Sequence, residues 1–231
     1  MLVYGKNSCE EVLLQNMENV QRVYLDRNFK DKKIISLLEK LKFYPIFYTK
    51  YELDELVNAN HQGIIVDIRD YVYCDLDEII KENGLLVMLD HLEDTHNFGA
   101  IIRTCEAAGV DGIIIPKDRS VRVNSTVMKT SSGACVNMKI AMVTNLVQTI
   151  HYLKDKGYWI VASDMNGIDY TSVDYRSATC LVIGNEGSGI SDLVRKSSDY
   201  IASIPMKGKI NSLNASVAAG VFIYEAVRQR K

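Results

Sequence analysis

Short, uninterrupted apolar runs alternate with helix-patterned segments along the whole 231-residue chain. In the larger C-terminal part, these runs lie at 85–89, 112–115, 159–162, 180–183 and 201–204. A continuous apolar strand is buried on both faces, which is typical of a parallel sheet covered by helices. The alternation therefore predicts an α/β fold with a largely parallel sheet.

The elements fall into two groups. Helical patterns at 99–108, 143–156, 190–197 and 213–229 accompany the five strands of the C-terminal group. The N-terminal group has strands at 20–25, 43–48 and 63–68 and helices at 9–17, 32–41 and 53–58. A polar, acidic stretch at 70–83 separates the groups, so we expect one domain over 1–75 and a second over 84–231.

Composition excludes several classes of protein. A hydrophobic content of 47% argues against disorder, and a net charge of -2 argues against a polybasic nucleic-acid wrapper. No apolar run is long enough to span a membrane, and residues 1–6 do not open a signal peptide. The five cysteines are odd in number and far apart, which favours reduced thiols in a cytoplasmic protein.

The first polar segment of interest follows the strand at 85–89 and leads into the helix at 99–108. Ligands gather at the carboxyl ends of strands in open parallel sheets, so this loop is well placed. Asn97 is a candidate N-cap, and Arg103 lies near the second turn of the helix. His91 and His96 are five residues apart, which does not place two imidazoles on one helix face, so no metal site is expected.

The second segment, Gly184-Asn185-Glu186-Gly187-Ser188-Gly189, joins the strand at 180–183 to a helix. Its glycines allow a backbone to approach a ligand closely. Their spacing differs from that of the dinucleotide-binding and phosphate-binding loops. A carboxylate has few packing reasons to lie in such a turn, so Glu186 is a candidate functional residue.

The third segment is a polar, basic loop after the strand at 201–204. The following helix opens with Ser212, Asn214 and Ser216, whose small polar groups suit the free N–H groups of a helix N-terminus. Small residues at 215 and 218–220 then predict that something packs very close to this helix.

Together, the three segments resemble the motifs of the SpoU/TrmH family of RNA ribose 2′-O-methyltransferases, which belongs to the SPOUT class. Asn97 to Arg103-Thr104 resembles the first motif, and 184–190 resembles the second. Ile204-Pro205-Met206 with 212–218 resembles the third. The resemblance implies S-adenosylmethionine as cofactor, a C-terminal trefoil knot and a homodimer with sites near the subunit interface.

The resemblance also implies roles for individual residues. The catalytic set is Asn97, Arg103, Glu186, Ser212 and Asn214, while backbone groups at Gly184, Ile204 and Leu213 hold the cofactor. In the family, the residue matching Arg103 is assigned to activating the hydroxyl. A guanidinium has a pKa above about 12 and cannot act as a base near neutral pH unless its environment is unusual. We therefore favour an arginine that polarises the hydroxyl and a phosphate, and no imidazole base is expected because the motifs contain no histidine.

The N-terminal group adds a second resemblance. Tyr4-Gly5-Lys6-Asn7 and His61-Gln62-Gly63-Ile64 are similar to the small substrate-binding domain of the RlmB-like branch, which resembles RNA-binding ribosomal proteins. The substrate of that branch is a guanosine in 23S rRNA. The basic stretch containing Lys117, Arg119, Arg122 and Lys129 is expected to contact RNA, with an affinity that falls with salt.

Three other functions fit parts of the sequence. A tRNA methyltransferase of the same family is disfavoured by the appended N-terminal domain. A catalytically silent RNA-binding protein is disfavoured because Asn97, Arg103, Glu186 and Asn214 are all present. A nicotinamide-dependent oxidoreductase is disfavoured by the glycine spacing and by the late position of the glycine-rich turn.

Overall fold

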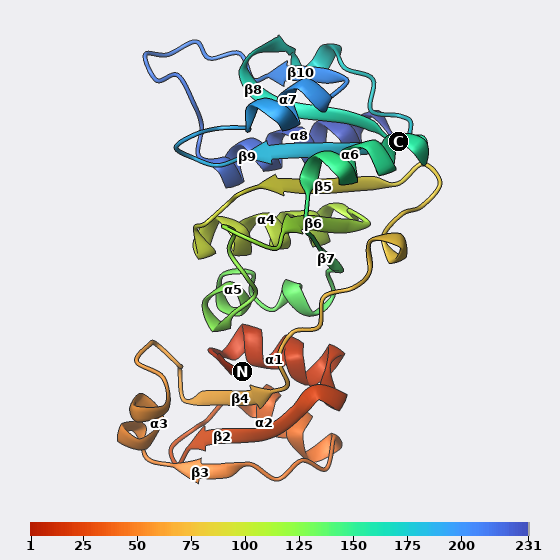
Figure 1. The fold of residues 1–231 in the computed structure, drawn as a ribbon. Coiled ribbons are helices and arrows are strands. Elements are labelled where there is room, and N and C mark those ends of the chain that lie inside the picture. The colour runs from red at the N-terminus through yellow and green to blue at the C-terminus, as the bar shows by residue number, and fades with distance from the viewer. Residues whose placement is uncertain (231) are drawn as a thin grey trace. The chain divides into compact units, whose positions relative to one another are not determined.

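The computed structural model describes residues 1–230, which form two compact units (Figure 1). The first unit contains Met1–Val72 together with Arg122–Asn137, and the second contains Tyr73–Val121 and the chain from Met138 onward. A linear division into 1–75 and 84–231 does not anticipate the excursion at 122–137. This excursion means that the N-terminal unit is built from two separate stretches of sequence.

The N-terminal unit has a four-stranded sheet in the order β1-β4-β2-β3. Strands β2 and β3 are parallel, whereas β4 runs antiparallel to β1 and β2. The strands are β1 (Leu2–Tyr4), β2 (Val20–Asp26), β3 (Ile46–Tyr48) and β4 (Ile64–Ile68), and the helices are α1 (Lys6–Gln15), α2 (Lys32–Lys40) and α3 (Lys50–Leu56). A 3-10 turn, η1 (Met17–Asn19), leads into β2.

The 122–137 excursion contributes α5 (Ser125–Thr130) and the 3-10 turn η3 (Ala134–Val136) to the same unit. Asn137 Nδ2 donates to Glu11 Oε1 on α1 at 3.0 Å. Lys129 Nζ donates to the Asn60 carbonyl at 2.5 Å and lies 4.5 Å from the centre of the Tyr4 ring. Lys129, which the sequence places among RNA-contacting residues, is thus engaged inside this unit.

The second unit has a six-stranded, entirely parallel sheet in the order β10-β8-β9-β5-β6-β7. The strands are β5 (Leu85–Asp90), β6 (Gly112–Pro116), β7 (Ile140–Val143), β8 (Trp159–Asp169), β9 (Thr179–Gly184) and β10 (Tyr200–Ser203). Every residue of β5 and β6 is buried, as expected for strands covered on both faces.

Helices cover both faces of this sheet (Figure 1): α4 (Thr95–Ala108) packs against α8 (Ala215–Gln229), while α6 (Leu146–Asp155) and α7 (Asp192–Ser197) lie on the other face. The 3-10 turns are η2 (Leu76–Glu78) and η4 (Tyr170–Ser172). Gly220 of α8 faces α4, because a Cβ added there would lie 3.9 Å from Thr104 Cγ2. In the described chain, no helix is long and apolar enough to cross a membrane.

Two local expectations are wrong. The helix expected from residue 143 begins at Leu146, because Asn145 caps it and 140–143 pairs with β6 as a strand. Asn97 does not cap α4: the Asp94 carboxylate accepts the His96 N–H at 2.9 Å instead. A carboxylate at the N-cap is additionally favoured by the helix dipole.

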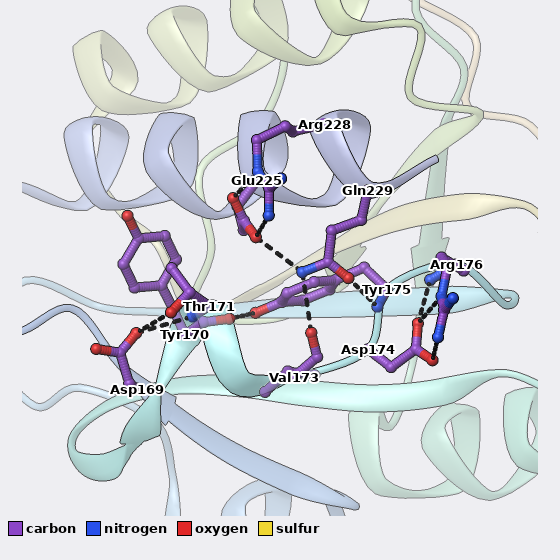
Figure 2. Close-up of polar contacts among 10 residues, drawn as sticks. All are labelled: Asp169, Tyr170, Thr171, Val173, Asp174, Tyr175, Arg176, Glu225, Arg228 and Gln229. Carbon is purple, nitrogen blue, oxygen red and sulfur yellow. Dashed lines mark hydrogen bonds and ion pairs between the residues drawn. The ribbon is translucent and has the colours of Figure 1, made fainter. Parts of the chain in front are cut away.

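The C-terminal turn of α8 is fastened to the loop before β9. The Glu225 carboxylate accepts from Arg228 and Gln229, and Gln229 in turn bonds the backbone of Val173 and Tyr175 (Figure 2). The neighbouring Arg228 guanidinium holds the pKa of Glu225 below its ordinary value. These contacts tie the last helix to the chain that precedes β9.

Arg230 completes this attachment by donating to four backbone carbonyls. They belong to Tyr175 (2.8 Å), Asn83 (2.7 Å), Ser177 (2.6 Å) and Gly84 (3.2 Å). Arg230→Ala should therefore lower the free energy of unfolding by about 2–4 kcal/mol, because partly buried carbonyls lose a charged donor. Thermal melts should show a drop of several degrees in Tm. Arg176→Ala removes an exposed pair with Asp174 and should leave Tm nearly unchanged, and an equal drop in both variants would contradict this role.

Candidate active site

Three loops lie at the carboxyl edge of the parallel sheet, where β5, β9 and β10 end. In Figure 1, β5 and β9 both point toward the left, and the chain leaves the sheet there. Asp90, the last residue of β5, pairs in register with Gly184, the last residue of β9. This pairing brings the first and second sequence motifs to the same edge of the sheet.

A direct side-chain contact joins these two motifs. The Asn97 amide, in the first turn of α4, donates to the carboxylate of Glu186 in the loop after β9. Asn97 is only 8% exposed, so the contact is shielded from water on one side. The structure therefore gives Glu186, a candidate functional residue of the second motif, a partner in the first motif. A charge-assisted hydrogen bond of this kind holds the loop against α4.

The loop after β9 is a tight turn whose shape is set by Asn185. Its backbone exchanges two hydrogen bonds with Gly189, at 3.0 and 2.9 Å. The Asn185 side chain accepts the Gly187 N–H at 2.8 Å and donates to the His91 carbonyl at 2.8 Å. A Cβ at Gly184 would lie 2.4 Å from the Gly189 carbonyl carbon, so only glycine fits there. Asn185 thus has a structural role that the motif comparison did not reveal.

An aspartate–histidine pair lies beside this turn and is the feature that sequence reasoning missed. Asp90 is 1% exposed, and its carboxylate accepts the Ser191 N–H at 2.7 Å. His91 Nδ1 lies 2.6 Å from the other carboxylate oxygen, within hydrogen-bond distance. His91 also adopts a φ of 57°, which is uncommon for a non-glycine residue. His91 thus lies beside the loop after β9, although it is not one of the motif residues.

The third loop joins β10 to α8 and differs from the other two. Within the described chain, residues 205–213 make no hydrogen bonds to other backbone groups and form neither helix nor strand. Leu213 and Met206 each expose 38% of their surface there, and Ser212 is also exposed. Asn214 caps α8 as expected, because its Oδ1 accepts from Ser216 N and Oγ and from Val217 N.

The remaining predicted residues are distributed more widely. Arg103 lies on the exposed side of α4, the helix that carries Asn97. Ile204 follows β10 directly and is partly buried. Lys117 and Arg119 belong to the second unit, whereas Arg122 and Lys129 belong to the first. No group of three or more histidine, cysteine or acidic residues suited to a metal occurs among the described residues.

All five cysteines carry free thiols, and four of them are buried. Burial raises the pKa of Cys135 to about 12 and raises those of Cys9, Cys105 and Cys180 as well. A thiol with a raised pKa is a poor nucleophile at neutral pH, so these cysteines are packing residues.

Comparison with known proteins supports this arrangement. The SpoU rRNA methylase family model matches residues 84–224, and a model described as RNA 2′-O ribose methyltransferase substrate binding matches residues 2–74. A protein of Staphylococcus aureus (strain COL), named as a TrmH family tRNA/rRNA methyltransferase, is 40% identical over 99% of this chain and 96% of its own length.

Two solved structures show the same fold to different extents. The SpoU methyltransferase AviRb from Streptomyces viridochromogenes, in complex with AdoMet, aligns with a TM-score of 0.85. It is 28% identical and covers 100% of this chain and 90% of its own. The A. aeolicus TrmH/SpoU tRNA modifying enzyme is 36% identical, with a TM-score of 0.58, but covers 65% of this chain and 77% of its own.

These matches define an RNA methyltransferase fold with an N-terminal substrate-binding domain. The chain belongs to the SpoU rRNA methylase family. The family and fold class expected from the three motifs are thereby confirmed.

Proposed function

We propose that this protein transfers the methyl group of S-adenosylmethionine to a ribose 2′-hydroxyl of RNA, and that the target is a guanosine in 23S rRNA. The observation that carries the proposal is the bond between Asn97 and Glu186, which assembles two motifs at the carboxyl edge of the sheet. Ligands of open parallel sheets bind at this edge.

The residues present fit S-adenosylmethionine. The 205–213 loop offers backbone groups that lie outside helices and strands, and the exposed side chains of Met206 and Leu213 offer apolar surface for an adenine ring. Gly184, Ile204 and Leu213 would hold the cofactor through their backbones. When bound, its sulfonium supplies an electrophilic methyl group.

The protein's own residues must then orient and activate the ribose. Arg103 lies on α4, which packs against α8, the helix that Asn214 caps. A guanidinium polarises the hydroxyl and an adjacent phosphate without losing its own proton. Asn97 and Glu186 fix the loop after β9, while Asn214 sets the start of α8 and Ser212 lies exposed just before it.

The N-terminal unit favours rRNA over tRNA as substrate. The tRNA modifying enzyme of A. aeolicus aligns with 65% of this chain, whereas the SpoU rRNA methylase model and the substrate-binding model together match residues 2–74 and 84–224. In this proposal the chain acts in the cytoplasm as a homodimer, and its C-terminal segment forms a trefoil knot. A tRNA methyltransferase and a silent RNA-binding protein are the alternatives.

Transfer of a tritiated methyl group to separate pools of rRNA and tRNA tests the activity and the substrate. We expect label in 23S rRNA, at a 2′-O-methylguanosine after nuclease digestion. Label only in tRNA would overturn the substrate assignment, and no label in either pool would favour the silent protein. Calorimetry on the full chain should also show heat with S-adenosylhomocysteine and none with NAD.

A further inference from the structure

We infer that an apolar cavity between α2 and β3 of the N-terminal unit binds an unstacked nucleobase of single-stranded RNA. The inference rests on the proposed function, because it assigns part of the RNA-binding surface. The cavity has a volume of about 370 Å³, which is within the range of small-molecule sites.

Aromatic rings form much of the cavity wall. The aromatic residues that line it are Phe29, Phe43, Tyr44 and Phe47. Tyr44 is 88% exposed and Phe47 is 57% exposed, so both rings are accessible to a ligand in this structure. Unpaired RNA bases are recognised by stacking on such rings, since every base has a π-face.

The end of α2 places a positive charge at the mouth of this cavity. Phe43 N–H donates to the Leu38 carbonyl and Lys42 N–H donates to the Glu39 carbonyl, which together form a Schellman motif. Lys42 occupies its left-handed position with a φ of 53°, where glycine is the usual residue. The motif holds Lys42, Phe43 and Glu39 at the cavity, so an ammonium and a carboxylate accompany the rings.

The charge of the surrounding segment is complementary to RNA. Residues 27–50 carry seven basic and two acidic side chains, although the rest of residues 1–83 carries four basic and thirteen acidic ones. An acidic unit that concentrates its positive charge in one aromatic-rich segment has the features of a single-strand binding track. The charge complementarity selects RNA as the occupant over a neutral apolar ligand.

A second cavity continues the same track. It has a volume of about 540 Å³, shares the Phe29 ring with the first cavity, and includes Lys30 and Lys50. Both lysines are exposed at the carboxyl ends of β2 and β3. A base in the apolar cavity would therefore have its phosphate backbone within reach of these lysines.

Fluorescence anisotropy on the full chain with a labelled oligoadenylate of about twelve nucleotides tests this inference. Phe47→Ala should weaken binding about tenfold, in line with the loss of one stacked base, and Phe47→Trp should retain it. Lys42→Glu should weaken binding more than Lys32→Glu, which changes the net charge equally but lies outside the cavity. Tyr51→Ala is the matched aromatic control, because Tyr51 is 71% exposed on the same unit and does not line the cavity.

Two further measurements separate this inference from the proposed function. Replacing nucleotides of the probe with abasic sites should weaken its binding to the wild type. The same replacement should leave its binding to Phe47→Ala unchanged. Equal binding by wild type and Phe47→Ala, or an equal loss in Tyr51→Ala, would overturn the cavity assignment while methyl transfer to rRNA still stood. Absence of methyl transfer by the wild type would instead count against the proposed function.

Discussion

Arg103→Ala is expected to reduce methyl transfer about a hundredfold or more, which corresponds to about 3 kcal/mol of transition-state stabilisation. Arg103 is an exposed residue of α4, whereas the cofactor contacts of this proposal are backbone groups of Gly184, Ile204 and Leu213. The affinity for S-adenosylhomocysteine should therefore remain nearly unchanged. Single-turnover kinetics with tritiated methyl donor, together with calorimetry, would measure the two quantities separately.

Arg103→Lys distinguishes a planar donor from a bare positive charge. An ammonium lacks the guanidinium fork that can bridge a hydroxyl and a phosphate, so this variant should stay close to Arg103→Ala in rate. Glu106→Ala, at another exposed position of α4, serves as the control and should keep wild-type activity. Full activity in Arg103→Lys would show that charge alone suffices and that the bidentate role is wrong.

The fold of the second unit could be predicted largely from its sequence. The five apolar runs lie within β5, β6, β8, β9 and β10 or one residue beyond, because strands buried on both faces must be continuously apolar. The short strand β7 was not predicted, because its four residues lie close to the helix at 146–155 and show no hydrophobic periodicity of their own. The observed start of a helix differs from the predicted one where a capping residue, such as Asp94 or Asn145, determines it.

Which stretches of the chain make up the N-terminal unit could not be predicted in the same way. The 122–137 excursion has a polar, irregular sequence that carries no sign of its partners. Its place is decided by contacts of high sequence separation, such as Asn137 with Glu11 and Lys129 with Asn60. Such pairings have no local periodicity, and only the folded chain reveals them.

The candidate site was predictable as a set of motifs but not as a set of contacts. Asn97 was expected as a helix cap because a lone asparagine before a helical pattern is typical of one. The nearby Asp94 caps the helix instead, which leaves the Asn97 side chain to bind Glu186. The Asp90–His91 pair was overlooked because it has no spacing pattern, although an ionisable residue directly after a buried strand could have drawn attention to it.

Gly184→Ala is expected to weaken cofactor binding more than tenfold, because the loop after β9 cannot keep its shape. The added Cβ would lie 2.4 Å from the Gly189 carbonyl carbon and 2.7 Å from Ile190 N, and both are backbone atoms that cannot swing aside. Relieving this overlap must break the paired bonds between Asn185 and Gly189 or move Asp90 away from the Ser191 N–H. Overpacking of this kind costs about 1–3 kcal/mol. Calorimetry with S-adenosylhomocysteine would measure the affinity, and a thermal melt would report the accompanying loss of stability.

Gly187→Ala provides a control three residues away in the same loop. A Cβ there would meet only Asn185 Oδ1 at 3.5 Å, an ordinary contact, and the residue does not need a positive φ. Its cofactor affinity should stay within about twofold of the wild type, since surface substitutions without strain have small effects. Equal cofactor affinity in Gly184→Ala and Gly187→Ala would contradict this prediction. It would show that the close contact between Gly184 and Gly189 does not determine the shape of the binding loop. The parallel loss of affinity and of stability in Gly184→Ala alone would instead show that the strand end and the loop act as one rigid support for the ligand.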